Sequence, residues 1–204
     1  MDEHVLVETR RSLHAVAERL LAGPQHRAHA TIRLTVTPGG FGQVRGPWRV
    51  VGTDLVGDAV RVPLRGTSED VAAAAGIAAG EPDGLYTDHA DLDGDLAVDP
   101  AAAAVIADWF ARGDAALREL APADQPVVWP EHFDLGIALD EMNYGVSPGD
   151  ATHPLPYAYV SPWTPRTGPF WNAPFGALRP ADELPDTATV LDFFTAGREV
   201  ARAG

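Results

Sequence analysis

The sequence predicts an α+β fold built on antiparallel sheet, with helices packed on one side. Two observations support this prediction. Short segments that alternate apolar and polar residues follow one another, separated by turns rich in glycine and proline. Helical patterns come after groups of strands and do not alternate with them, which favours antiparallel pairing. Each half of the chain therefore consists of strands followed by a helix. We expect a single domain over residues 1–204, with a seam within residues 80–99.

The first half begins with a helix at residues 5–21, where apolar side chains recur at helical spacing, and Gly23-Pro24 is expected to end it. Residues 30–37 alternate in polarity and predict a strand, and residues 38–47 form a glycine-rich turn. The remaining elements expected here are strands at 48–56 and 57–66 around a Gly57-Asp58 turn, and a helix at 68–79 capped by Thr67 and Asp70.

The second half begins at Asp99-Pro100, a helix start with aspartate as the N-cap and proline in the first turn. The helix spans residues 100–120, and Asp186 caps a final helix that runs to residue 203. The side chains expected to be buried by the first of these helices are Val105, Ile106, Trp109, Phe110 and Leu117, with Gly113 as its weak point. The strands expected between the helices span 127–129, 132–139, 142–147, 157–161 and, less regularly, 170–178.

Composition excludes several functional classes. The 204 residues carry a formal net charge of -14 and contain neither lysine nor cysteine. Phosphate backbones and anionic lipid would be repelled, so we expect no nucleic-acid and no membrane binding. Without lysine there is no Schiff-base chemistry or Walker-type loop, and without cysteine no disulfide or thiolate ligand. The opening residues lack a signal-peptide pattern and the longest apolar run is short, so the cytoplasm is the expected location.

Two loops resemble ligand-binding motifs but do not fit them. The turn "TPGGFG" follows a strand, yet it lacks the G-x-G-x-x-G spacing of a dinucleotide-binding loop. The acidic loop at 88–96 does not match a calcium-binding EF-hand. With Asp91 at position 1, Leu96 takes the glycine position and Ala102 the glutamate position. We interpret the first as a hairpin turn and the second as a solvated loop.

The densest group of polar and aromatic side chains lies between residues 127 and 172. In a strand, His132 and Asp134 would share one face while Phe133 and Leu135 point into the core. This arrangement favours small-molecule binding in a polar and aromatic pocket, or a modest hydrolase- or isomerase-type activity in which His132 is the acid–base residue and the Asp134 carboxylate orients it. The expected ligand-binding residues are Trp129, Asn143, Tyr144, Asp150, Tyr157, Trp171 and Asn172. In the order Ser-Pro-Gly-Asp, Gly149 is expected to take a positive φ in a type II turn.

Two other functions stay open. His132, Asp134 and His153 resemble the iron-binding triad of oxygenases, with Arg166 to hold a carboxylate. The twenty-one positions between the two histidines are fewer than such a barrel needs, so no metal site and no cofactor is assigned. A non-catalytic protein that acts by self-association is the alternative from another class, and exposed aromatic side chains would favour it.

Three segments in a fixed order carry a resemblance to a known family. They are "WPEHFDL" at 129–135, "EMNYGVSPGD" at 141–150 and "PYAYV" at 156–160. The sequence resembles an uncharacterised bacterial domain-of-unknown-function family with W-P-x-H-F-D-L, M-N-x-G-x-x-x-G-D and P-Y-x-Y-V segments. The resemblance covers nearly the whole chain and implies one compact unit with a shared polar cluster. The chain differs at Glu131, where that family commonly has a second histidine, so a histidine-pair metal site is not implied.

Overall fold

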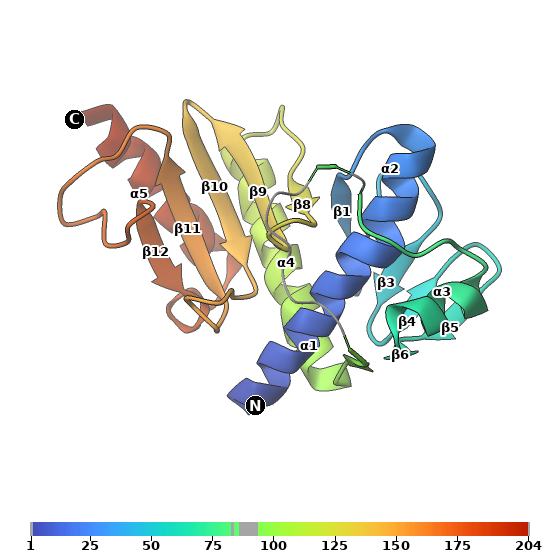
Figure 1. Cartoon of the computed structure of the whole chain (residues 1–204). Helices are drawn as coiled ribbons and strands as arrows, with labels where there is room; N and C mark the ends of the chain where they lie inside the picture. The colour runs from blue at the N-terminus through green and yellow to red at the C-terminus, as the bar shows by residue number, and fades with distance from the viewer. Residues whose placement is uncertain (1, 83, 86–93, 204) are drawn as a thin grey trace. The chain divides into compact units, whose positions relative to one another are not determined.

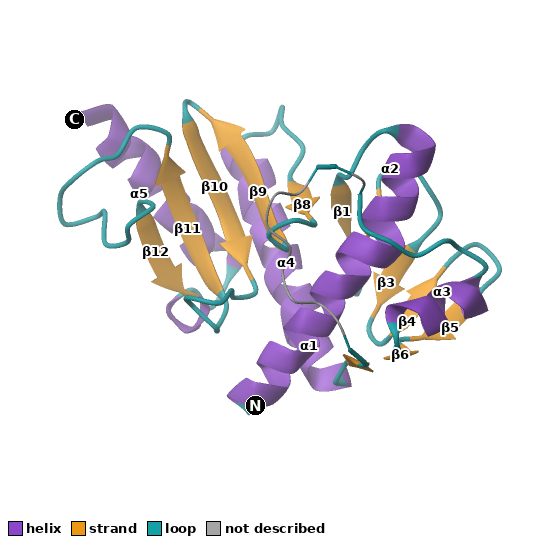
Figure 2. Ribbon diagram, viewed as in Figure 1, coloured by secondary structure: helices purple, strands orange, loops and turns teal. Residues whose placement is uncertain are grey.

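The computed structural model describes residues 2–82, 84–85 and 94–203. The expected acidic loop at 88–96 lies largely outside the described residues. The chain divides into two compact units, one of Met1–Asp108 with Val128–Phe133 and the other of Trp109–Val127 with Asp134–Gly204. The chain thus passes from one unit to the other within a long helix, between residues 127 and 128, and after residue 133. Helices and antiparallel strands occur together, so the predicted α+β fold class is confirmed (Figure 2).

The first unit begins with a long helical segment that runs past its expected end. Helix α1 (Glu3–Val16) continues through a π-helical turn, η1 (Ala17–Ala22), into α2 (Gly23–His29) (Figure 1). The prediction that Gly23-Pro24 ends the helix is wrong. The wider π turn changes the hydrogen-bond register just before the proline, whose missing N–H is then tolerated in the first turn of α2. A Cβ on Gly23 would overlap the Gly80 carbonyl oxygen, so close backbone approach explains this glycine.

The sheet of the first unit is an antiparallel meander. Its strands are β1 (Leu34–Thr37), β2 (Gly40–Gln43), β3 (Arg49–Val51), β4 (Asp54–Val56) and β5 (Arg61–Pro63), and β8 (Val127–Trp129) pairs with β1 through Val128 and Leu34. Two predictions are corrected here. The glycine-rich segment at 38–47, expected to be a turn, contains strand β2. Glycine is needed in this strand because a Cβ on Gly40 would overlap the carbonyl oxygen of Val50 on β3. The strand expected at 48–56 is two strands joined by a turn at Gly52, whose φ is +59°.

Helix α3 (Ser68–Ala75) confirms the capping pattern read from the sequence. The Thr67 hydroxyl accepts from the Asp70 amide at 3.1 Å, and the Asp70 carboxylate accepts from the Thr67 amide at 3.0 Å. The helix ends at Gly76, earlier than expected, because that residue takes the left-handed conformation. Beside it, β6 (Arg65–Gly66) and β7 (Leu96–Ala97) form a separate two-stranded ladder.

Helix α4 (Pro100–Leu120) begins in the first unit and continues into the second. The predicted N-cap is confirmed, since Asp99 Oδ1 accepts from the amides of Ala101 and Ala102 at 2.9 Å each. Of the five side chains expected to be buried, four are buried: Ile106, Trp109, Phe110 and Leu117. Val105 is 40% exposed, since it lies one position from Ile106 and about 100° around the helix from it.

The second unit contains a four-stranded antiparallel meander with α5 (Thr187–Ala203) on one face (Figure 1). Its strands are β9 (Asp134–Leu139), β10 (Met142–Ser147), β11 (Tyr157–Pro162) and β12 (Ala177–Pro180), followed by a 3-10 turn, η2 (Ala181–Glu183). On the helical face, Tyr144 contacts Phe194 of α5, and a Cβ on Gly113 of α4 would overlap Val146. Because side chains alternate along a strand, the intervening residues point to the other face.

The predicted Asp186 cap of α5 is also confirmed, since Asp186 Oδ1 accepts from the Thr189 amide at 2.9 Å. None of the helices in the described ranges combines the length and apolar character needed to span a bilayer.

Candidate functional site

A glycine pair shapes the face of the second sheet that is opposite to α5. In the register of the strands, Gly145 of β10 lies opposite Gly136 of β9 and opposite Tyr159 of β11. A Cβ on Gly136 would come within 2.9 Å of the Tyr159 hydroxyl oxygen, and a Cβ on Gly145 would overlap the same hydroxyl group. The two glycines therefore leave a flat surface on which the Tyr159 side chain extends across β10 toward β9.

Two tyrosine–aspartate pairs lie on this face. The Tyr159 hydroxyl donates to Asp134 Oδ2 at 2.5 Å, and the Tyr157 hydroxyl donates to Asp150 Oδ2 at 2.5 Å. The two tyrosines are two positions apart on β11 and so share a face, with ring centroids 6.4 Å apart. We call Asp134, Tyr159, Tyr157 and Asp150 the Tyr–Asp row.

A turn after β10 positions the second aspartate. Asp150 Oδ1 accepts from the backbone amides of Thr152 at 2.6 Å and His153 at 2.7 Å, and the Asp150 amide donates to the His153 carbonyl at 2.7 Å. The Ser147 hydroxyl oxygen accepts from the Gly149 amide at 3.1 Å. The φ of Gly149 is +109°, so the predicted positive φ is confirmed. The turn thus holds Asp150 in place before any ligand arrives.

Burial and hydrogen bonding set the protonation states of the row. Burial, and then the nearby Asp134 carboxylate, raises the pKa of Tyr159 well above its usual value. Burial and the hydrogen bond to Asp150 raise the pKa of Tyr157 in the same direction. For Asp150, burial acts to raise the pKa, but the donors from Tyr157, His153 and Thr152 outweigh it, and the pKa is lowered. At neutral pH the tyrosines are therefore protonated and Asp150 is ionised.

Aromatic rings lie next to the Asp150 end of the row. The His153 ring lies edge-on to Tyr157 at 5.6 Å between centroids, and Phe175 lies 6.5 Å from each of them. Phe175 is 37% exposed, whereas Tyr157 is buried and His153 is half-buried. A polar row with an aromatic border is suited to hold a small molecule that has both polar and apolar parts.

His132 is not placed as the sequence suggested. It lies in an exposed turn, outside β9, and its ring makes no hydrogen bond or ion pair in the part of the chain that the structure describes. Phe133 follows with a φ of +49°, which interrupts the strand alternation that would have put His132 and Asp134 on one face. Phe133 and Leu135 are buried as expected. Asp134 is bound by Tyr159, and His132 is not part of the row.

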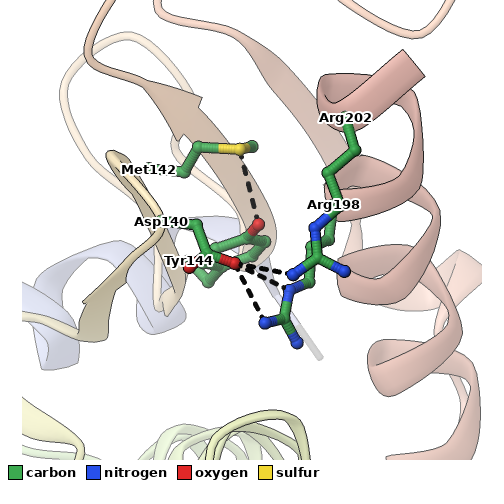
Figure 3. Close-up of polar contacts among 5 residues, drawn as sticks. All are labelled: Asp140, Met142, Tyr144, Arg198 and Arg202. Atoms are coloured by element: carbon green, nitrogen blue, oxygen red, sulfur yellow. Dashed lines mark hydrogen bonds and ion pairs between the residues drawn. The ribbon is translucent and has the colours of Figure 1, made fainter.

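Tyr144 is not part of the Tyr–Asp row, because its side chain points to the opposite face of the sheet. Its side chain is fully buried, its hydroxyl lies 3.4 Å from Met142 Sδ, and its ring meets Phe194 edge-on at 6.0 Å. Burial raises its pKa. Figure 3 shows this region, in which Asp140 accepts from Arg198 and Arg202 of α5 at 2.9 Å and 3.0 Å. Tyr144 is thus a core residue beside a structural ion pair.

The other expected ligand-binding residues make local contacts. Asn143 Oδ1 accepts from Trp163 Nε1 at 3.2 Å, and Asn172 holds the backbone of Leu178 with both of its amide atoms. Trp171 meets Phe170 edge-on at 5.0 Å. Trp129 belongs to the first unit, where the Arg33 guanidinium lies 5.7 Å from its ring. Of the expected site residues, the structure therefore brings together Asp134, Asp150 and Tyr157.

The three residues considered as an alternative iron triad are not brought together in the described part of the chain. Among the residues that the structure describes, no three histidine, aspartate or glutamate side chains lie close enough together to hold a metal ion. This covers His132, Asp134 and His153, the set considered for an oxygenase.

Two features of interest were missed at the level of sequence. Tyr159 joins the row only because Gly136 and Gly145 clear its path, and the alternation in "PYAYV" was the signal that could have found it. In the first unit, His14 Nε2 lies 3.2 Å from Oε1 of the buried Glu18, and the His14 ring stacks on Phe133 at 5.5 Å. This histidine–carboxylate pair has the i, i+4 spacing of neighbouring helix residues.

Comparisons of the chain with protein-family models, with curated proteins and with solved structures gave no significant match. The resemblance to the uncharacterised bacterial family therefore stays a prediction. What the Tyr–Asp row can bind follows from its own chemistry.

Proposed function

We propose that the protein binds a small organic cation, such as an amine or a guanidinium compound, at the Tyr–Asp row. One observation carries the proposal: the hydrogens of both tyrosine hydroxyls are committed to carboxylates. Toward a ligand, the oxygens of the row therefore act as hydrogen-bond acceptors. Since Asp150 is ionised at neutral pH, the complementary ligand supplies N–H donors and positive charge.

The surroundings support a cation on two further grounds. The net charge of -14 raises the local concentration of cations and repels anions. The rings of Tyr157 and Phe175 offer aromatic faces next to Asp150, and a cation over such a ring gains about 0.5–2 kcal/mol. The carboxylate and the aromatic rings together favour binding of an organic cation over a hydrated metal ion, because a hydrated metal ion does not contact the rings favourably.

We propose ligand binding, and not catalysis, as the function of the Tyr–Asp row. A tyrosine with a raised pKa keeps its proton at neutral pH and is a poor general base, and Asp150 with a lowered pKa is a weak base as well. His132, the expected acid–base residue, is exposed and has no carboxylate to orient it within the described chain. The proposal includes the cytoplasm as the location of the protein.

Isothermal titration with ethylammonium, guanidinium and tetramethylammonium chloride, against sodium chloride at equal ionic strength, tests this proposal. We expect saturable binding of at least one organic cation. Asp134→Asn and Tyr159→Phe should each weaken it about tenfold, because a hydrogen bond to a charged group contributes about 1.5–3 kcal/mol. Matched controls are Tyr144→Phe, which removes a hydroxyl from the opposite face, and Asp182→Asn, which removes an exposed charge.

The controls should bind as tightly as the unchanged protein, and circular dichroism should show that all four variants are folded. The proposal fails if no organic cation binds saturably. It also fails if Asp182→Asn weakens binding as much as Asp134→Asn, since the attraction would then be a general effect of net charge.

A further inference from the structure

The first unit contains a cavity of about 620 Å³, away from the Tyr–Asp row in the sequence and different in chemistry. Its walls come from the start of α1, from β4 and β5, from the β6–β7 ladder and from the first residue of α4. This volume lies within the range of ligand pockets in proteins, roughly 300–1,000 Å³.

Buried hydroxyls of α1 hold one wall of the cavity in place. The Ser12 hydroxyl oxygen accepts from the Ala97 amide at 2.8 Å, and the Thr9 hydroxyl oxygen accepts from the Asp99 amide at 3.1 Å. Both hydroxyl side chains are buried. Ala97 in turn pairs with Arg65 in the β6–β7 ladder. Helix, ladder and the start of α4 are thus fixed to one another, and the cavity is formed without a ligand.

The acidic groups that line the cavity are already neutralised or bonded. Glu8 Oε1 lies 3.4 Å from Arg11, and Asp54 Oδ2 lies 2.5 Å from Arg61. Asp99 Oδ1 accepts two amides at the start of α4. Arg65 differs, because its guanidinium makes no ion pair or hydrogen bond with any residue that the structure describes. A cation would have to displace Arg11 or Arg61, whereas an anion meets Arg65 directly.

The rest of the lining is apolar and includes Val5, Pro63, Leu64, Leu96 and Val98. We propose that this cavity binds a small monocarboxylate with an aliphatic or aromatic body. The guanidinium of Arg65 takes the carboxylate, a pairing that its planar donors make in bidentate form. The apolar body lies against the side chains of α1, β5 and β7 and leaves water, which favours binding in proportion to the area covered. This second ligand class is independent of the cation proposed above.

Isothermal titration with hexanoate and benzoate at fixed ionic strength tests the site, with hexanamide and benzamide as neutral analogues of the same shape. We expect saturable binding of the acids and at least tenfold weaker binding of the amides. Arg65→Gln should reduce affinity for the acids at least tenfold and leave the amides unchanged. Arg49→Gln, on β3 and outside the lining, is the matched control and should bind like the unchanged protein.

A second variant tests the apolar part. Ala97→Phe adds a ring at a lining position and should abolish binding of the acids while circular dichroism stays that of the unchanged protein. The proposal is overturned if neither acid binds saturably, if Arg65→Gln and Arg49→Gln lose affinity equally, or if folded Ala97→Phe binds as tightly as before.

Discussion

Gly113 on α4 and Val146 on β10 form a close helix–sheet contact in the second unit that can be tested by substitution. A Cβ on Gly113 would overlap Cγ2 of Val146 and come within 2.9 Å of its Cγ1. Val146 itself is fully buried. Gly113→Ala, Val146→Ala and the double variant therefore form a double-mutant cycle. In the double variant, the methyl group added at position 113 occupies space left by the two methyl groups removed from position 146.

The magnitudes follow from the contact. Gly113→Ala gains about 1 kcal/mol in helix propensity but loses about 2 kcal/mol to overpacking, a net loss of about 1 kcal/mol. Val146→Ala removes two buried methyl groups and costs about 2 kcal/mol. In the double variant the overpacking disappears, and the loss is about 1 kcal/mol instead of the additive 3. The expected coupling is about 2 kcal/mol, within the range for residues in contact.

Urea unfolding followed by circular dichroism measures the free energy of each variant. The control cycle pairs Gly113→Ala with Val50→Ala, a buried valine of the other unit, and should be additive within about 0.5 kcal/mol. Additivity in the Gly113–Val146 cycle, or a stabilising Gly113→Ala, would show that the helix is not held against β10 by this contact.

Three further predictions concern local structure. Glu141→Gly should stabilise the protein by about 1 kcal/mol in urea unfolding, because Glu141 has a φ of +58° and a left-handed residue costs about 1–2 kcal/mol; an unchanged midpoint would count against strain in this turn. Gly149→Val should destabilise by about 1 kcal/mol or more, since its φ is +109°, and an unchanged melting temperature would contradict this. The lowered pKa of Asp150 means that its carboxylate stabilises the fold above its unfolded pKa of about 3.8, and that this stability is lost as pH falls through the folded pKa. Asp150→Asn should therefore lower stability at pH 7 and reduce its loss between neutral and acidic pH, and a parallel pH profile would refute this.

Local signals in the sequence determined a large part of the fold. Thr67 with Asp70, Asp99 with Pro100, and Asp186 each predicted a helix start that the structure confirms, because a cap involves only residues within one helical turn. The positive φ of Gly149 was predictable for the same reason, since the Ser-Pro-Gly-Asp order constrains one turn by itself. Alternating polarity likewise located most of the strands.

Tertiary structure decided which distant residues are in contact, and these contacts form the candidate site. Gly23 lies inside the helix after a π turn and is a glycine because the Gly80 backbone leaves no room for a side chain, a contact between residues far apart in the chain. Phe133 takes a left-handed φ that removes His132 from the strand, although the sequence there alternates as a strand would. Tyr159 of β11 reaches Asp134 only across a glycine pair, with one glycine on β10 and the other on β9 beside Asp134. Sequence periodicity tells which residues share a face of one strand, whereas strand pairing and register, set by contacts over long separations, decide which faces meet.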